Sequence, residues 1–302
     1  MKILITGGTG LIGNALSKQL IAEGHSLAVL TRHPEKYQST NIHYIGNFAE
    51  INDEDAIDAV INLAGEPIAD KRWTADRKKQ LEDSRIALTA QLISTLSRLK
   101  TKPTVLISGS AIGYYGNGED NTLTEHSNAT DEFSHRLCAA WEMQALRAKA
   151  LGIRVCIVRT GIVLAQNGGM LKKLSLPFKL GLGAFLGSGN QWMSWIHLDD
   201  VVNCILFLLK NDGLKGIFNA TTPQPVTNRD FTRAYAKSLR RPALFTFSES
   251  LLTLMFGEMA HILVTGQRVI PQQLQEAGFK FQYPELEPAL NEISGRKNKD
   301  YT

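Results

Sequence analysis

Cysteine is scarce in this chain of 302 residues. Its 3 cysteines, Cys138, Cys156 and Cys204, are odd in number and far apart, so they form neither a disulfide framework nor a metal-ligand spacing. No uninterrupted apolar run reaches the roughly 18 residues that a membrane span needs. The first residues also lack the long apolar stretch of a signal peptide. The sequence therefore predicts a cytoplasmic protein with no metal site and no membrane partner.

The chain also lacks a large excess of positive or negative charge. The formal net charge is +4, and no long run of residues carries it. A short basic tail, Arg296, Lys297 and Lys299, is expected to be a solvated chain end. Because no basic stripe alternates with aromatic residues, the sequence gives no support to nucleic acid as a partner. A small molecule is the class of ligand that remains.

Apolar residues are abundant, at 43% of the chain, which is enough for a large buried core. Short runs rich in β-branched residues alternate with patterns of helical spacing through the first half. The predicted strands cover residues 2–6, 26–30, 42–45, 59–63, 104–108 and 155–159, and the predicted helices cover 11–23, 76–99 and 132–151. This alternation predicts an α/β fold, a Rossmann-type doubly wound parallel sheet with helices on both faces.

The alternation stops near residue 165. Residues 180–189 are rich in glycine and are predicted to form a loop, whereas 199–210 and 216–219 have the patterns of one more helix and strand. From Pro223 onward the sequence is mostly helical. We therefore predict a Rossmann domain from residues 1–165 plus about 195–225. A smaller, mostly helical substrate or lid lobe would comprise about 166–194 and 226–302.

A glycine-rich turn follows the first predicted strand. Gly7 permits a tight turn, Gly10 lets the backbone approach a pyrophosphate, and Gly13 lets the next helix lie close to the sheet. The first turn of that helix offers free N–H groups and the positive end of its dipole to phosphates. A tight turn without a ligand is the alternative. The predicted dinucleotide contacts are Gly7, Thr9, Gly10, Leu11, Ile12 and Gly13.

The second predicted strand is followed by Thr31 and Arg32. A site for NAD carries Asp or Glu there to accept from the ribose hydroxyls, and no acid is present. Arg32 can instead bind a 2′-phosphate through a forked, charge-assisted contact, and Thr31 can add a hydroxyl donor. These residues favour NADP(H) as the cofactor. The alternative is a surface arginine that merely follows a strand.

These motifs resemble the extended short-chain dehydrogenase/reductase superfamily, in its NAD(P)-dependent epimerase/dehydratase group. The shared stretches are residues 6–13, 62–65, 108–110, 114–116 and 195–200. A closer likeness is to an atypical subgroup, the YfcH-type epimerase-family proteins, with their characteristic C-terminal segment. That likeness is carried by residues 63–68, 84–85, 141–142, 180–183, 266–271, 277–281 and 283–286, and it extends over essentially the whole chain.

The resemblance implies further contacts with the cofactor. Leu63, Ala64 and Gly65 would pass beside the adenosine ribose at the end of the fourth strand. Arg85 would reach a cofactor phosphate or ribose, with a surface ion pair as the alternative. Ser108, in the fifth strand, and Val163, after the sixth, would complete the set.

The catalytic pair of the superfamily is missing. Active members use Tyr-x-x-x-Lys on the helix after the fifth strand, where the Lys lowers the Tyr pKa and the Tyr transfers a proton. None of the 7 tyrosines here is followed four positions later by Lys. Aligning Glu142 with a Glu common in epimerases places Cys138 at the Lys position and Ser134 at the Tyr position. We expect Cys138 to be a small core residue, because no cationic neighbour is visible in the sequence.

Three residues are the remaining candidates for catalysis. Ser110 occupies the position of the superfamily's substrate-orienting Ser, or caps a turn. Tyr115 can donate a proton, or only pack. Glu142 can accept from cofactor or substrate, although a structural role is favoured.

The sequence thus predicts an NADP(H)-dependent oxidoreductase or epimerase that acts on an unidentified small carbonyl or sugar-like substrate. A non-catalytic NADP(H)-binding sensor or regulator linked to cell division is the alternative. The oligomeric state stays open, with a homodimer among the candidates.

Overall fold

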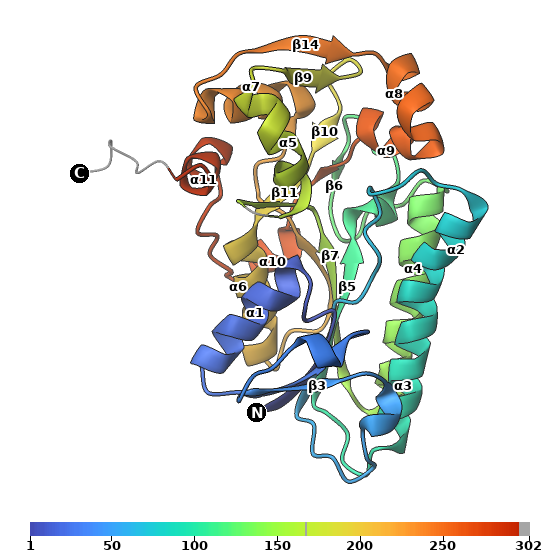
Figure 1. The fold of residues 1–302 in the computed structure, drawn as a ribbon. Helices are drawn as coiled ribbons and strands as arrows, with labels where there is room; N and C mark the ends of the chain where they lie inside the picture. The colour runs from blue at the N-terminus through green and yellow to red at the C-terminus, as the bar shows by residue number, and fades with distance from the viewer. Residues whose placement is uncertain (167, 296–302) are drawn as a thin grey trace.

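The central feature of the computed structural model, which describes residues 1–166 and 168–295, is a parallel sheet flanked by helices (Figure 1). Within the described residues the sheet has seven strands in the order β12-β7-β5-β4-β1-β2-β3. Their bounds are β1 Lys2–Thr6, β2 Ser26–Leu30, β3 Ile42–Ile45, β4 Ala59–Asn62, β5 Val105–Ala111, β7 Arg154–Thr160 and β12 Gly216–Ala220. The strand order reverses direction between β1 and β4, which is where ligands of doubly wound sheets bind. The predicted Rossmann-type fold is confirmed.

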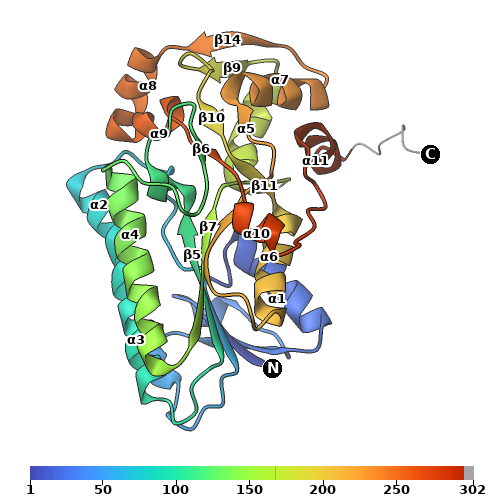
Figure 2. The same cartoon turned by 180° about the vertical axis from the view of Figure 1, so that it is seen from behind.

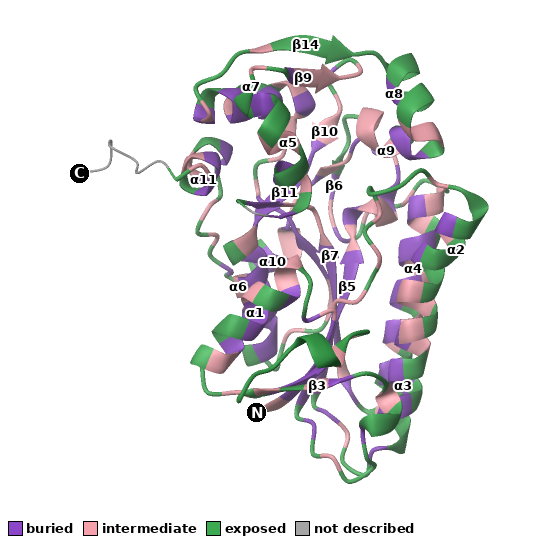
Figure 3. Cartoon of the chain, in the orientation of Figure 1, coloured by how far each residue is buried: buried purple, intermediate pink, exposed green. Residues whose placement is uncertain are grey.

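Helices cover both faces of this sheet. Helices α1 (Leu11–Ala22) and α6 (Leu198–Lys210) cover one face, and α3 (Leu88–Arg98) and α4 (Phe133–Leu146) cover the other (Figures 1 and 2). Alternate residues of β1 enter the two cores: Ile3 packs with the α1 side, and Leu4 with the α3 side. Since both faces are buried (Figure 3), the strands are continuous apolar runs rather than alternating ones.

The long helix predicted at residues 76–99 is present, but it is not uniform. Helix α2 (Ala75–Glu82) passes into a single π-helical stretch, Asp83–Ala87, and then into α3. Stretches of this kind are rare and occur often at functional sites, because the wider turn redirects one side chain. Here the stretch carries Arg85.

The chain beyond β7 forms a second group of elements. It begins with β8 (Ile162–Ala165), which pairs with β11 (Trp195–His197), and continues with α5 (Gly169–Lys179). Residues 180–189, predicted as a loop, contain the strand β9 (Gly183–Leu186). Strand β9 pairs with β14 (Ala243–Phe247), so the loop prediction is wrong for four residues. The pairing partner lies far along the chain, and no local pattern reveals it.

The C-terminal part is mostly helical, as predicted. Its helices are α7 (Asn228–Ser238), α8 (Glu249–Phe256), α9 (His261–Val264), α10 (Gln272–Glu276) and α11 (Leu286–Ile293). Two pairs of short strands join it to the rest: β10 (Trp192–Met193) pairs with β13 (Val226–Thr227), and β15 (Arg268–Val269) with β6 (Thr122–Leu123).

The tail also returns to the central sheet. Leu274 and Phe279 share a hydrophobic core with the α1 side of the sheet. The buried carboxylate of Asp200 accepts from the backbone N–H groups of Gln282 and Tyr283, at 2.7 and 2.9 Å. The division into two lobes stays a prediction.

Two further predictions concern membrane-spanning segments and the basic chain end. Among the described residues, no helix is both long and apolar enough to cross a membrane. The basic residues Arg296, Lys297 and Lys299 lie outside the described residues.

Candidate functional site

The glycine turn between β1 and α1 leaves no room for a side chain at Gly7 or Gly13. Gly7 has φ +71°, and a Cβ atom there would lie 2.6 Å from the carbonyl carbon of Leu63. A Cβ on Gly13 would lie 2.3 Å from the carbonyl oxygen of Gly7. Gly10 precedes α1, and no side chain caps the helix, so no capping side chain occupies its first N–H groups. The turn therefore has the form of a phosphate cradle, and it fits a dinucleotide.

A buried polar cluster joins the strand ends beneath this turn. Thr6 Oγ1 donates to Asn62 Oδ1 at 2.6 Å and accepts from Ala64 N at 3.2 Å. Asn62 Nδ2 donates to Ser108 Oγ at 3.1 Å. These contacts fix the ends of β1, β4 and β5 relative to one another. Ser108, predicted near the cofactor, is fully buried in this cluster.

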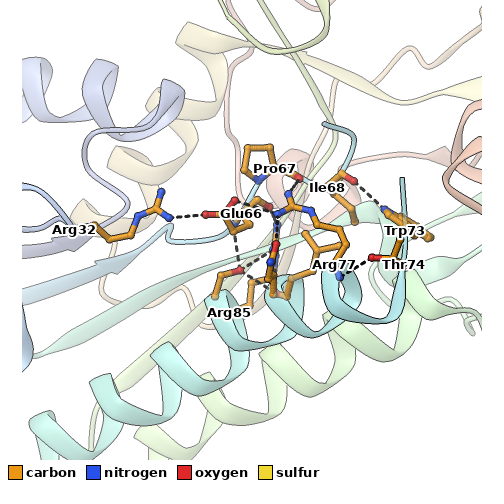
Figure 4. A network of polar contacts seen from close by, with 11 residues as sticks. Arg32, Glu66, Pro67, Ile68, Trp73, Thr74, Arg77 and Arg85 are labelled. Carbon is orange, nitrogen blue, oxygen red and sulfur yellow. Dashed lines mark hydrogen bonds and ion pairs between the residues drawn. The ribbon is translucent and has the colours of Figure 1, made fainter. Parts of the chain in front are cut away.

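Arg32 stands just beyond β2, and its side chain is 84% exposed (Figure 4). Its Nη1 donates to Glu66 Oε1 at 2.8 Å. The other oxygen of Glu66 accepts from Nη1 of the buried Arg77 at 3.3 Å. Burial raises the pKa of Glu66, but the hydrogen bonds and charges of Arg77 and Arg32 outweigh it and leave the pKa below its ordinary value.

The sequence alone did not reveal this acid. Glu66 follows β4 and is 34 residues away from Arg32 along the chain. The order of the strands brings the ends of β2 and β4 to either side of β1. An acid is therefore present beside the expected 2′-phosphate position, although it belongs to a different strand end from the one that NAD sites use.

Arg85 lies directly beneath the loop that carries Glu66 (Figure 4). Its Nη2 donates to the carbonyl oxygen of Glu66 at 2.8 Å, and its Nη1 to that of Leu81 at 3.2 Å. A Cβ on Gly65 would lie 2.9 Å from the Arg85 Cζ. Burial lowers the pKa of Arg85. This arginine supports the loop from below, and a side chain at position 65 would require its guanidinium to move.

The candidate catalytic residues Ser110 and Glu142 meet in a buried network. Ser110 Oγ, at the end of β5, donates to Glu142 Oε1 at 2.6 Å. Arg159 of β7 donates to both oxygens of the same carboxylate, each at 2.8 Å. All three residues are at most 5% exposed. Because an arginine neutralises Glu142, its carboxylate orients Ser110 rather than standing free as a base.

Tyr115 belongs to the same network, in a 3-10 turn after β5. Its hydroxyl donates to Asn219 Oδ1 at 2.7 Å and accepts from Arg159 Nη1 at 3.1 Å. The guanidinium of Arg159 also lies 3.3 Å from the ring centre of Tyr114. Burial raises the pKa of Tyr115, although Arg159 and Asn219 oppose the shift.

Arg159 and Asn219 were not predicted from the sequence. One signal was available, because Arg159 follows the apolar run 155–158 inside β7, and a charged residue at such a position needs a buried partner. The identity of that partner depends on the packing of α4 against β7, which the sequence does not state.

The helix face that should carry Tyr and Lys is buried. Ser134 and Cys138 on α4 are 6% and 4% exposed. Burial, with Glu142 nearby, raises the pKa of the Cys138 thiol to about 11, so the thiol stays protonated near neutral pH. Cys138 lies in the core, as expected from its sequence context.

The remaining predicted contacts surround the same edge. Thr31 is half-buried after β2, and Leu63 and Ala64 are half-buried after β4. Val163 belongs to β8 and is also half-buried. The carboxyl edge of the sheet brings together, from separate elements, Gly7, Thr9, Gly10, Leu11, Ile12, Gly13, Thr31, Arg32, Leu63, Ala64, Gly65, Ser108 and Ser110.

The sheet and its glycine turn define a Rossmann-type nucleotide-binding protein. Residues 3–220 match the NAD dependent epimerase/dehydratase family, and residues 248–293 match a domain of unknown function, DUF1731. The chain belongs to the NAD dependent epimerase/dehydratase family.

The chain is similar to relatives along nearly its whole length. The epimerase family protein Mb2239 of Mycobacterium bovis is 39% identical over 298 residues, which cover 97% of this chain and 98% of the relative. The chloroplastic epimerase family protein SDR39U1 homolog of Arabidopsis thaliana is 36% identical over 304 residues, covering 97% of this chain and 86% of the relative.

Solved structures have a similar fold. The human epimerase family protein SDR39U1 (isoform 2), crystallised with NADPH, has a TM-score of 0.90 and 30% identity, with 98% of this chain and 99% of that one covered. The UDP-glucose 4-epimerase of Thermotoga maritima has a TM-score of 0.79 at 17% identity, which shows the shared fold alone. It covers 98% of both chains.

Proposed function

We propose that this chain binds NADPH across the carboxyl edge of its sheet. The observation that carries the proposal is the exposed Arg32 next to a glycine turn in which a Cβ atom would clash. A guanidinium with this exposure can bind a 2′-phosphate without any rearrangement of the core. The human relative crystallised with NADPH supports the choice of cofactor.

Different residues would contact different parts of the dinucleotide. The N–H groups of Leu11 and Ile12, in the first turn of α1, would hold the pyrophosphate. Gly10, whose own N–H donates to the Gly7 carbonyl oxygen at 3.0 Å, would let the backbone approach it. Arg32 and Thr31 would hold the 2′-phosphate. The backbone from Leu63 to Gly65 would pass the adenosine ribose, with Arg85 supporting it.

We further propose an NADP(H)-dependent oxidoreductase or epimerase whose substrate is a small carbonyl or sugar-like molecule. The bound nicotinamide supplies or accepts a hydride in such reactions. Ser110 is the substrate-orienting group, since Glu142 and Arg159 fix its hydroxyl at the end of β5. Tyr115 is the proton donor, and Asn219 orients its hydroxyl.

A second candidate is a sensor or regulator that binds NADP(H) without turnover. It is favoured by the buried Ser134 and Cys138, which stand where active relatives place Tyr and Lys. A cytoplasmic location stays a prediction for either function.

Titration of the purified chain with NADPH and with NADH, followed by nicotinamide fluorescence, tests the cofactor. We expect NADPH to bind more tightly, and equal affinities would overturn the assignment. A screen of carbonyl and sugar-nucleotide compounds at saturating NADPH, followed by absorbance at the nicotinamide band and by product analysis, tests turnover. Turnover that persists in S110A and Y115F variants would contradict their roles, and no turnover with any compound would favour the sensor.

A further inference from the structure

Glu66 lies between two arginines that differ in exposure (Figure 4). The side chain of Arg32, which pairs with Oε1, is 84% exposed, whereas that of Arg77, which pairs with Oε2, is 6% exposed. The pKa of Glu66 lies below its ordinary value, so its carboxylate is ionised at neutral pH. One negative charge therefore serves two cations, of which Arg32 stands in solvent and Arg77 in the interior.

The backbone and the side chain of Glu66 are both held in place. Its N–H donates to Ser84 Oγ at 3.0 Å, and its carbonyl oxygen accepts from Arg85 Nη2 at 2.8 Å. Within the described part of the chain, Glu66 is the only acid at ion-pair distance from Arg77. Removing the counter-charge of a buried arginine is costly, whereas opening an exposed ion pair costs little. Arg32 is therefore the partner that can leave, and Glu66 stays with Arg77.

Arg32 is also the residue that would bind the 2′-phosphate. Among the residues that the structure describes, its guanidinium makes one hydrogen bond, from Nη1 to Glu66 Oε1 at 2.8 Å. Arginine binds phosphate most strongly through two parallel N–H···O bonds, and the end of this guanidinium offers such a fork only when Nη1 is released. A phosphate on the same guanidinium would also lie close to the ionised carboxylate, which repels it. Both effects favour a guanidinium that turns away from Glu66 when the 2′-phosphate is bound.

We propose that Glu66 is a specificity-determining residue, which competes with the 2′-phosphate of NADPH for Arg32 and so limits the preference for NADPH over NADH. The inference rests on the proposed NADPH site and adds a role for an acid within it. In the empty site Glu66 holds Arg32. When NADPH binds, Arg32 exchanges the carboxylate for the phosphate, and Glu66 keeps Arg77. NADH has a hydroxyl in place of this phosphate, so the Arg32–Glu66 pair persists when NADH binds.

Isothermal titration calorimetry of the full chain with NADPH, NADH and adenosine 2′,5′-bisphosphate tests the exchange. The bisphosphate carries the 2′-phosphate without the nicotinamide half. E66Q keeps the size of the side chain and removes its charge. It should bind NADPH and the bisphosphate about three- to fivefold more tightly, the gain expected when an exposed ion pair no longer has to open. Its affinity for NADH should stay within twofold of the wild-type value.

Two further variants check this result. E66A offers Arg32 neither a charge nor an acceptor, so it should bind NADPH at least as tightly as E66Q does. E287Q is the matched control, since Glu287 on α11 pairs with the exposed Lys237 at 3.0 Å, and it should leave all three affinities unchanged.

The fold should tolerate E66Q. Arg77 keeps the carbonyl oxygen of Pro67 at 2.6 Å and Gln80 Oε1 at 3.1 Å as acceptors. Thermal unfolding of each variant without nucleotide checks that the binding measurements compare folded chains.

A double-mutant cycle shows whether Glu66 acts through Arg32. In the R32A background there is no guanidinium to exchange, so adding E66Q should change the affinity for NADPH by less than twofold. A gain as large as in the wild-type background would overturn the proposal. Equal tightening of NADPH and NADH in E66Q would overturn it too, because the effect would not depend on the 2′-phosphate.

The opposite order of affinities for NADPH, with E66Q weaker than the wild type and E66A weaker still, would also overturn the competition. It would show that Glu66 supports Arg32 while other guanidinium nitrogens bind the phosphate. In each of these cases the wild-type chain still binds NADPH, so the proposed cofactor stands. A wild-type chain that binds neither NADPH nor the bisphosphate would overturn the proposed function together with this inference.

Discussion

Glu142 and Arg159 form a buried, bidentate ion pair that connects α4 to β7, with both N–O distances at 2.8 Å. Burial opposes the charge of Arg159, but the hydrogen bonds and charge of Glu142 raise its pKa above the ordinary value. Ser110 donates to the same carboxylate. The pair therefore sets the geometry at the end of β5, where the substrate is expected.

The first prediction concerns this pair. R159M should lower the free energy of unfolding by about 3–5 kcal/mol, because it leaves the Glu142 carboxylate buried without a counter-charge. The double variant R159M/E142L should recover a large part of that loss, since no buried charge remains. Urea unfolding followed by circular dichroism measures both. Additive losses in the double variant would contradict the ion-pair account.

The second prediction concerns Arg32. R32A should weaken NADPH binding by tenfold or more, because a charge-assisted contact with the 2′-phosphate contributes about 1.5–3 kcal/mol. Binding of NADH, which lacks that phosphate, should change little. Isothermal titration calorimetry with both nucleotides measures the two effects.

R136A is the matched control for R32A, since Arg136 is an exposed arginine of α4 that pairs with Asp131. It should leave both affinities unchanged. An equal loss of NADPH and NADH binding in R32A would show that Arg32 does not bind the 2′-phosphate.

The third prediction concerns the glycine turn. G13A should lower the free energy of unfolding by about 1–3 kcal/mol and abolish nucleotide binding, because the added Cβ would lie 2.3 Å from the Gly7 carbonyl oxygen. G213A is the control, since a Cβ there meets no atom within 4 Å. Thermal unfolding with and without NADPH measures both. If NADPH stabilised G13A as strongly as the wild type, the proposal that this turn binds the phosphates would be contradicted.

The fourth prediction concerns pH and Glu125, which is 6% exposed. Its Oε1 accepts from Asn219 N at 2.9 Å, whereas its buried Oε2 has no hydrogen-bond partner among the described residues. Burial raises the pKa of Glu125 above its ordinary value of 4.5, although backbone hydrogen bonds oppose the shift.

The raised pKa fixes the sign of the pH effect. Between pH 4.5 and the raised value, the folded chain binds more protons at Glu125 than the unfolded chain does, so stability falls as the pH rises. E125Q removes this contribution, and its stability should fall less steeply over that range. Urea midpoints measured from pH 4.5 to 7.5 give both slopes. E82Q, at an exposed position of α2, should retain the wild-type slope, and an unchanged slope in E125Q would contradict the prediction.

Much of the sheet was predictable from local sequence. The first three strands occur at the predicted residues, since short β-branched runs bounded by glycine and polar residues specify buried strands. The glycine turn was predictable too, because the conformation of Gly7 and the close approach at Gly13 permit no other residue.

The pairs that define the site were not predictable in the same way. The strand β9 was missed because its partner β14 is about 60 residues away, and four residues give no period of their own. Glu66 was missed because it is distant from Arg32 along the chain. Only the order of the strands brings the two residues together. The π-helical stretch that places Arg85 follows from packing rather than from composition.

The α/β class, the phosphate turn and the absence of the Tyr-x-x-x-Lys pair follow from residue type and short spacing, so local sequence was enough to predict them. Which polar side chains meet depends instead on the three-dimensional fold. It joined Arg32 to Glu66, Glu142 to Arg159 and Tyr115 to Asn219, whose partners lie 17 to 104 residues apart. The energy of a buried polar or charged group depends on its neighbours in space. A parallel sheet brings strand ends that are distant in sequence to one edge.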